Sequence, residues 1–231
     1  MTSRINILTI QSGSEGNAYI VSDPQTTILL EAGLPYREII KKYNNTGKPI
    51  NAVLISHKHS DHCLGAKDFE NRRIPIYTHD EVAEHKKLYL YNQIKSGETY
   101  TIDSFIVKPF ELEHDVYNLG FLIYSKITKE KLLFITDTMY VKNKFKGINY
   151  LMIECNHSTD KLMSNKQYHS HLKKRIRQTH LNLDDVLYFL ESNNFENLKE
   201  IYLIHRSKQN SDDKLILEKI SEKTKAKAIL C

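Results

Sequence analysis

The residues best suited to chemistry lie in one short segment, HKHSDH, at positions 57–62. This segment directly follows an apolar run, Ala52–Ser56, that is typical of a buried strand. It offers three imidazoles and one carboxylate as potential metal ligands, with no thiolate, and this set suits Zn²⁺ or another divalent transition metal. Because α/β proteins place functional groups at strand ends, we expect a metal site here rather than a solvated polar turn.

Three further residues with metal-binding side chains each follow an apolar strand pattern. His114 comes after a run that ends at Leu112, Asp137 follows LLFIT, and His205 follows IYLI. Taken singly, each also fits a surface or capping residue, but the repeated placement at strand ends indicates a shared metal site. Two divalent ions held together can bridge a hydroxide and polarise a phosphoryl or carbonyl oxygen. The predicted chemistry is therefore hydrolysis with a nucleophile that exists at neutral pH.

The elements expected to position these residues are short strands and helices in alternation. Patterns of β-branched and apolar residues predict strands over 5–10, 17–22, 26–31, 52–56, 74–78, 99–102, 105–112, 119–124, 131–136, 150–154, 200–204 and 226–230. Helices are expected after Pro35, from about Leu64, and over 79–94, 166–177, 183–192 and 212–223. Strands first, helices interleaved and more strands later indicate two packed sheets with helices outside, an α/β or α+β class.

Composition limits the remaining options. The chain has 231 residues, of which 40% are hydrophobic and 26% charged, so disorder is excluded and one domain spanning 1–231 is expected. No run approaches the ~20 apolar residues of a membrane span, and the first residues lack a signal-peptide pattern. We therefore predict a soluble cytoplasmic protein without membrane association. Three cysteines without a CxxC pair do not form a disulfide framework, and the net charge of +5 permits a polyanionic substrate.

The order HKHSDH, His114, Asp137, His205 resembles the metallo-β-lactamase fold, a four-layer αββα sandwich with a dinuclear metal site. Asp61 and His62 together are the pattern of the hydrolytic members, which disfavours oxidoreductase chemistry, and Asp61 is expected to be catalytic. The resemblance implies two sets of ligands and a bridging carboxylate: His57, His59 and His114 for one metal, Asp61, His62 and His205 for the other, and Asp137 between them. Two Zn²⁺ ions are expected, with Mn²⁺ as the alternative.

A narrower resemblance rests on five segments in the same order: QSGSEGNAYIV, LLEAG, IECNH, HLKKRIRQTHLN and IHRSKQN. They are similar to those of the bacterial YycJ/WalJ group of metal-dependent exonucleases, and more distantly to tRNA 3′-processing ribonuclease Z. Two departures are notable. Glu31 stands where relatives usually have Asp, and Thr179–Asn182 replaces Gly-His-Leu-Ser. Glu31 is expected to support a metal ligand without binding the metal itself.

Hydrolysis of a phosphodiester also requires a proton donor for the leaving oxygen. His180 is the candidate, because its place before His205 resembles that of the ribonuclease Z histidine credited with this role. The alternative is a histidine that binds backbone at a helix start. Glu154 is expected to orient His180 or a metal ligand, although a solvated acid at a strand end fits its position equally well.

Four residues are predicted to contact the substrate: Ser12, Asn17, His157 and Lys174. Ser12 and Asn17 lie in a loop whose backbone N–H groups suit an anion, although an ordinary hairpin turn explains them almost as well. Lys174 belongs to the basic stretch HLKKRIRQ, which also fits a solvated helix face. His157 fits no ligand position.

These features favour a metal-dependent phosphodiesterase that uses a metal-bridging hydroxide on nucleic acid, an exonuclease by the YycJ/WalJ resemblance. The first alternative is a phosphodiesterase for 3′,5′-cyclic nucleotides, because phage relatives of this fold destroy such immune signals and the chain shows no insertion for a tRNA-binding arm. The second alternative is a thioester or lactone hydrolase, against which the basic segment beside His180 argues. The expected partner is a nucleic acid or nucleotide, and fold analogy suggests a homodimer.

Overall fold

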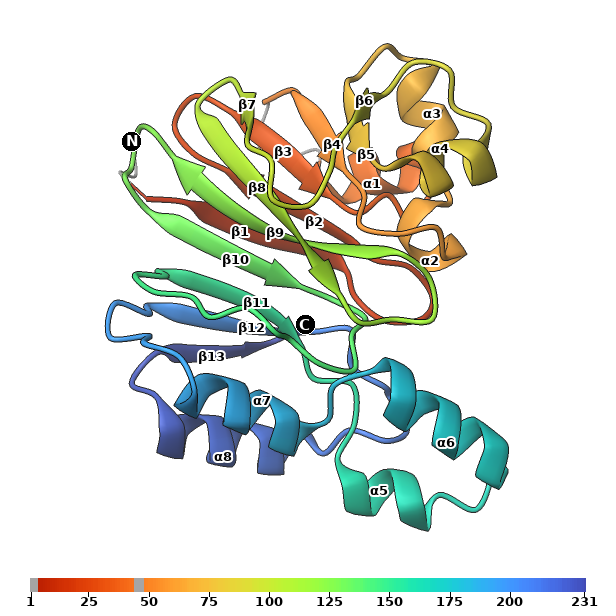
Figure 1. Cartoon of the computed structure of the whole chain (residues 1–231), viewed down its shortest axis with the longest axis vertical. Helices are drawn as coiled ribbons and strands as arrows, with labels where there is room; N and C mark the ends of the chain where they lie inside the picture. The colour runs from red at the N-terminus through yellow and green to blue at the C-terminus, as the bar shows by residue number, and fades with distance from the viewer. Residues whose placement is uncertain (1–3, 44–47) are drawn as a thin grey trace. The chain divides into compact units, whose positions relative to one another are not determined.

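The computed structural model describes residues 4–43 and 48–231, which form the strands and helices of a mixed α/β protein (Figure 1). The strands make a six-stranded sheet, in the order β1 to β6, and a seven-stranded sheet, in the order β13-β12-β11-β10-β9-β8-β7. The chain divides into two compact units: unit 1 comprises 1–110 and 121–130, and unit 2 comprises 111–120 and 131–231.

Unit 1 contains the whole six-stranded sheet. Its elements are β1 (Asn6–Gln11), β2 (Ala18–Ser22), β3 (Thr27–Leu30), α1 (Tyr36–Tyr43), β4 (Ala52–Leu54), α2 (Ser60–Cys63), α3 (Ala66–Glu70), β5 (Ile76–Thr78), α4 (Asp80–Lys86), β6 (Asn92–Gln93) and β7 (Tyr100–Ile102). Strands β8 (Phe105–Leu112) and β9 (Asn118–Ser125) each have residues in both units. β1, β2 and β3 pair antiparallel, whereas β3 to β6 pair parallel.

The parallel strands of unit 1 bring chemically useful residues to one edge. Because the carboxyl ends of parallel strands meet at the same edge of a sheet, Glu31 after β3, His57 after β4 and His79 after β5 are neighbours there. The strands are buried on both faces, as their continuous apolar sequence requires. Strand residues such as Val53 pack with helix residues such as Phe69 in one hydrophobic core.

Unit 2 repeats this scheme with a parallel sheet. Its elements are β10 (Lys131–Ile135), β11 (Tyr150–Glu154), α5 (Thr159–Ser164), α6 (Ser170–Thr179), α7 (Leu183–Glu191), β12 (Glu200–Ile204), α8 (Asp213–Lys223) and β13 (Lys227–Leu230). β10 to β13 pair parallel in the order β13-β12-β11-β10, so Asp137, Glu154 and His205 meet at one edge. α7 and α8 lie alongside β11, β12 and β13, and α8 contacts β13 (Figure 1). Unit 1 and unit 2 thus each contain both helices and strands.

Two sequence-based expectations were wrong in detail. The helix expected over 79–94 ends at Lys86, because Lys87 adopts a left-handed conformation and Ile94 then returns to donate its N–H to the carbonyl of Thr78. His79, expected as the first residue of that helix, is instead the N-cap residue before α4 and is only 4% exposed. The sequence patterns also did not indicate α5.

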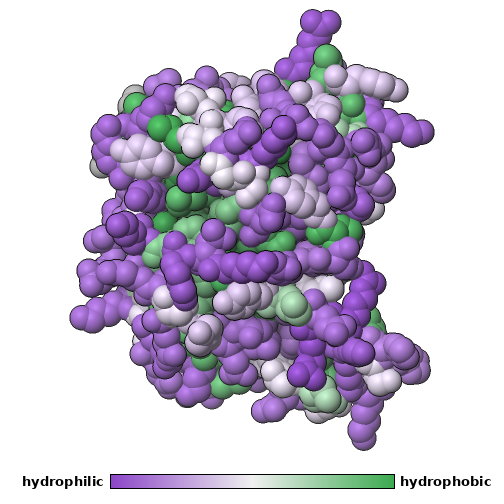
Figure 2. Space-filling model, viewed as in Figure 1, coloured by the Kyte–Doolittle hydropathy of each residue, from purple (hydrophilic) through white to green (hydrophobic). Residues whose placement is uncertain are grey.

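Charged and polar side chains cover most of the face shown in Figure 2. Across residues 4–43 and 48–231, none of the helices is long and apolar enough to cross a bilayer.

Candidate metal centre

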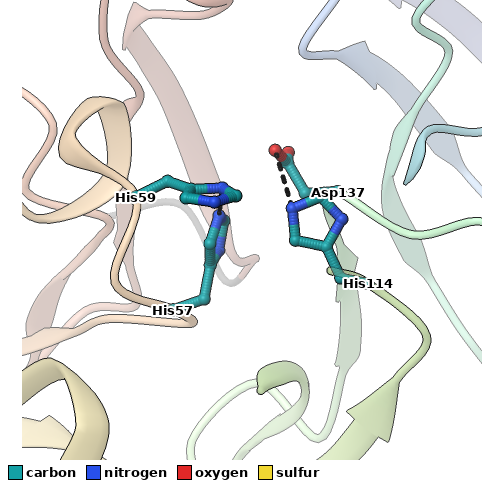
Figure 3. A group of neighbouring side chains, drawn as sticks. All are labelled: His57, His59, His114 and Asp137. Carbon is teal, nitrogen blue, oxygen red and sulfur yellow. Dashed lines mark hydrogen bonds and ion pairs between the residues drawn. The ribbon is translucent and has the colours of Figure 1, made fainter. Parts of the chain in front are cut away.

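In unit 1, the loop after β4 brings two imidazoles together. His57 Nε2 and His59 Nδ1 lie 3.1 Å apart, with the rings nearly perpendicular (Figure 3). On its other side, His57 Nδ1 is 2.9 Å from the Ser56 hydroxyl. If Nδ1 donates to this hydroxyl, the lone pair of His57 is on Nε2 and is directed toward the same point as His59 Nδ1. Two imidazole nitrogens in this arrangement are suited to a shared metal ion.

Asp61 and His62, at the start of α2, form the second half of the unit 1 cluster. Asp61 Oδ2 is 3.4 Å from His62 Nε2, and the Asn17 amide lies 3.1 Å from the same nitrogen. Backbone bonds fix this segment: the Asn17 N–H donates to the Asp61 carbonyl at 2.7 Å, and the Ala32 N–H donates to the His62 carbonyl at 2.8 Å. A Cβ at Gly33 would lie 1.8 Å from the Asp61 carbonyl oxygen, so only glycine fits there.

Glu31 contacts the loop after β4 through Ser56 and the ring of His62. Its buried carboxylate accepts the backbone N–H of Ser56 at 3.2 Å, and Oε2 lies 3.5 Å from His62 Nδ1. Burial raises the pKa of Glu31, and the hydrogen bonds from His62 and Ser56 offset only part of that rise. Glu31 thus contacts His62, a predicted metal ligand, and its supporting role stays a prediction.

Two residues that sequence reasoning did not single out also position this loop. Ser56 holds His57 through its hydroxyl, and the His79 Nε2 atom is 3.1 Å from the Ser56 carbonyl oxygen. Burial lowers the pKa of His79, so its ring is neutral at pH 7. The sequence offered one signal that could have identified His79, namely its position directly after an apolar strand, as for His57.

In unit 2, His114 and Asp137 form a pair, with His114 Nε2 4.0 Å from Asp137 Oδ2 (Figure 3). His114 Nδ1 donates to the Thr179 carbonyl at 3.1 Å, which leaves the lone pair on Nε2. Burial lowers the pKa of His114 even though Asp137 and Asp115 oppose the shift, so the ring is in the neutral form that binds metals.

Glu154 connects the other ionisable groups of unit 2. Its Oε1 atom is 2.6 Å from His180 Nδ1 and 3.0 Å from His205 Nδ1. Its Oε2 atom accepts the backbone N–H groups of Thr138 at 3.1 Å and Leu181 at 3.2 Å. One buried carboxylate therefore fixes both rings and both segments that follow Asp137 and His180.

The charges of this group are mutually dependent. Burial alone would raise the pKa of Glu154, but the charge of His180 and the hydrogen bonds from His180 and His205 outweigh it and lower the pKa. Burial alone would lower the pKa of His180, but the Glu154 and Asp137 carboxylates raise it. The His180 and His205 rings stack with centroids 5.3 Å apart. His180 is thus a partly exposed imidazole that is favoured in its protonated form.

The donor atoms of both clusters fit a divalent metal. In unit 1, a ligand atom of His57 lies within 4.8 Å of one of His59, and a ligand atom of Asp61 lies within 4.8 Å of one of His62. In unit 2 the same holds for Asp137, Glu154, His180 and His205. Imidazole nitrogen and carboxylate oxygen are the ligands of transition-metal hydrolytic sites. Two of these positions, Asp137 and His205, have positive φ angles of 44° and 49°, and so does the neighbouring Glu31 at 64°, a backbone conformation that is strained for residues other than glycine.

The predicted substrate contacts have mixed placements. The Ser12 hydroxyl is 2.8 Å from the Tyr19 hydroxyl, and Asn17 is buried with its amide on Gly13 and the Asp61–His62 segment. Lys174 is exposed on α6. His157 is fully buried, and neither of its ring nitrogens has a hydrogen-bond partner among residues 4–43 and 48–231. These substrate roles remain predictions.

A family model described as the β-lactamase superfamily domain matches residues 19–205. The chain belongs to this family. It is similar to exodeoxyribonuclease WalJ of Streptococcus pneumoniae serotype 2, with 29% identity over 87% of this chain and 81% of the relative. It is also similar to exodeoxyribonuclease YycJ of Bacillus anthracis, with 26% identity over 92% of this chain and 86% of the relative.

Among solved structures, the metallo-β-lactamase fold protein YhfI from Bacillus subtilis superposes with a TM-score of 0.75 at 15% identity, covering 99% of this chain and 97% of the other. The prediction of a metallo-β-lactamase fold, with two sheets and helices, is confirmed. The resemblance to the YycJ/WalJ group is confirmed as well.

Proposed function

We propose that this member of the family is a metal-dependent phosphodiesterase that hydrolyses nucleic acid as an exonuclease. The single observation that carries this conclusion is the pair formed by Glu154 and His180, held 2.6 Å apart beside Asp137 and His205. It gives a cluster of metal-competent ligands its own proton donor, which a phosphodiester leaving group requires. The named activities of the WalJ and YycJ relatives support the same assignment.

The residues proposed to hold the metal are those of the two clusters: His57, His59, Asp61, His62, His114, Asp137 and His205. We propose two divalent ions, Zn²⁺ first and Mn²⁺ as the alternative. When bound, such ions supply Lewis acidity toward a phosphoryl oxygen and a nucleophile at neutral pH. Glu31 and Glu154 keep ligand rings oriented through the contacts described above.

His180 is proposed to deliver the proton. Its Nδ1 atom is committed to Glu154, so the Nε2–H of the protonated ring is the group that meets the leaving oxygen of the phosphodiester. Glu154 holds the ring in this orientation and stabilises its positive charge until the proton departs. Asp61, through its carboxylate beside His62, completes the proposed catalytic set.

A substrate panel tests the assignment. Bis-p-nitrophenyl phosphate, single- and double-stranded oligonucleotides, 3′,5′-cyclic nucleotides and an acyl thioester are each incubated with Zn²⁺ or Mn²⁺. We expect cleavage of oligonucleotides from an end. Hydrolysis of cyclic nucleotides alone would establish the first alternative, and hydrolysis of the thioester alone would establish the second.

His59→Ala tests the metal ligands. We expect it to lose bound metal and to reduce phosphodiesterase activity at least 100-fold, as measured by elemental analysis and initial rates. His85→Ala is the matched control, because His85 is an exposed imidazole of the same unit. Equal metal content and activity in His59→Ala and the wild type would remove the proposal.

We also propose that residues 1–231 act as one domain, as a homodimer and in the cytoplasm. The family match over most of the chain supports the single domain, and the dimer rests on fold analogy. Light scattering on the purified chain would measure its oligomeric state.

A further inference from the structure

Helix α6 carries a stripe of polar and basic side chains along one side. His171, Lys174, Arg175 and Gln178 are spaced i, i+3, i+4 and i+7, so they share a side of the helix, and all four are exposed. They are called the α6 stripe below. Of the ten residues of α6 only Thr179 is buried, and none is acidic. The stripe is therefore a solvent-facing surface whose charge attracts anions.

Arg175 connects the α6 stripe to the candidate metal centre. Its Nη2 atom lies 3.2 Å from Asp115 Oδ2, and Asp115 Oδ1 lies 3.2 Å from His114 Nε2. The His114 ring is in turn close to that of His180, with the centroids 5.7 Å apart. A single carboxylate thus separates the Arg175 guanidinium from the His114 nitrogen that is proposed to bind metal. These contacts place the guanidinium on the side of the helix that faces His114.

The last turn of α6 is fixed at the same place. His180 is the C-cap residue, and its N–H donates to the Ile176 carbonyl at 3.0 Å. The Thr179 carbonyl accepts the Nδ1–H of His114 at 3.1 Å. The α6 stripe therefore begins beside His114 and His180 and extends away from them by about 1.5 Å per residue along the helix.

We propose that the α6 stripe binds the phosphate groups of a nucleic-acid strand next to the scissile phosphodiester, with Arg175 as the first phosphate ligand. This inference rests on the proposed function and identifies how its substrate is held. The contact with Asp115 uses Nη2 of Arg175. A guanidinium has further N–H donors, arranged in a fork that matches phosphate oxygens. Lys174, next to Arg175 on the stripe, forms no ion pair with residues 4–43 or 48–231.

The other two cations of α6 lie outside the stripe. Lys173 Nζ donates to the Met163 carbonyl of α5 at 2.7 Å. Arg177 is exposed and, being two residues beyond Arg175, lies on the opposite side of the helix. Arg177 is therefore a matched control for Arg175, because it has the same charge, the same side chain and the same helix.

The test compares two substrates in the metal-loaded protein: a single-stranded DNA oligonucleotide, and bis-p-nitrophenyl phosphate, a phosphodiester without neighbouring phosphates. We expect Arg175→Gln to lower kcat/KM about 10-fold more for the oligonucleotide than for the small ester, because a charge-assisted hydrogen bond to a neighbouring phosphate is lost. The slope of log kcat/KM against log salt concentration for the oligonucleotide should become shallower by about 0.7, the contribution of one phosphate contact on a single strand. Lys174→Gln should shift both quantities in the same direction.

Arg177→Gln should leave the ratio of the two kcat/KM values and the salt slope as in the wild type, and melting curves should show that all variants fold. An equal loss on both substrates in Arg175→Gln would reduce Arg175 to a residue that positions His114 through Asp115, and would overturn the phosphate site. Equal effects of Arg175→Gln and Arg177→Gln would also overturn it, while leaving phosphodiesterase activity in place. So would loss of binding to phosphatidylserine vesicles in Arg175→Gln with unchanged oligonucleotide kinetics, which would assign the stripe to a lipid surface. Hydrolysis of neither substrate by the wild type would overturn the proposed function and the site with it.

Discussion

Three histidines of unit 2 each commit one ring nitrogen to a fixed oxygen. His114 donates to the Thr179 carbonyl, while His180 and His205 bind the Glu154 carboxylate. In each ring the other nitrogen is the one that the proposed chemistry would use, for a metal ion or for a leaving group. The residue types could be predicted from sequence because they follow apolar strands. The tautomer of each ring could not be predicted, because it depends on a hydrogen-bond partner 26 to 65 residues away in the sequence.

His157 differs from these histidines, since both of its ring nitrogens are buried and have no hydrogen-bond partner in the part of the chain that the structure describes. Burial lowers its pKa to about 4 from the usual 6.5. Between pH 6.5 and 4 the unfolded chain therefore binds a proton that the folded chain does not, and stability falls as the pH falls. Acid should cost the wild type up to about 3 kcal/mol of unfolding free energy through His157, and we expect His157→Leu to abolish this loss. Denaturant unfolding at pH 7 and pH 4.5 measures it. Parallel pH dependences in variant and wild type would contradict the assignment.

At the scale of elements, the parallel strands explain why distant residues meet. Their continuous apolar runs were predictable, and so was the placement of His57, Asp137 and His205 just beyond them. The boundaries of the helix after His79 were not, because its end depends on Leu88 and Ile94 turning back toward the buried sheet. The contacts by which Ser56 and Glu31 hold the loop after β4 were only partly predictable from the sequence, because they depend on the register of β3 against β4.

The caps of two helices provide an element-scale prediction. Asn182 caps α7 with a reciprocal bond to Asp185, and Asp212 caps α8 by accepting the Leu215 N–H. Replacing either by Ala should cost about 1 kcal/mol of stability, seen as a melting temperature lowered by about 2–4 °C. Only Asn182→Ala should also reduce kcat, because Asn182 follows His180 and Leu181 directly. Equal kcat in the two variants would show that α7 does not position His180, the proposed proton donor.

For the whole molecule, metal binding and folding should be linked. The family, the two-sheet fold and the kind of metal site were accessible from sequence, since the ligands are few and follow a regular strand pattern. The small pocket lined by Tyr140 and Tyr188 could not be predicted, because it forms only where the segment after Asp137 meets α7. The global prediction concerns metal removal. A free metal concentration 100-fold above Kd should stabilise the fold by about 2.7 kcal/mol, or roughly 5–11 °C in Tm. Identical melting curves with Zn²⁺ and with a chelator would contradict it.

The left-handed backbone at Glu31, Asp137 and His205 has a consequence for protein engineering. An L-residue pays roughly 1–2 kcal/mol for this conformation, which glycine adopts freely. A stabilisation campaign guided only by backbone preference would therefore select glycine at all three positions. The resulting protein would be expected to melt at a higher temperature and to have lost the two carboxylates and the imidazole to which the proposed chemistry assigns roles.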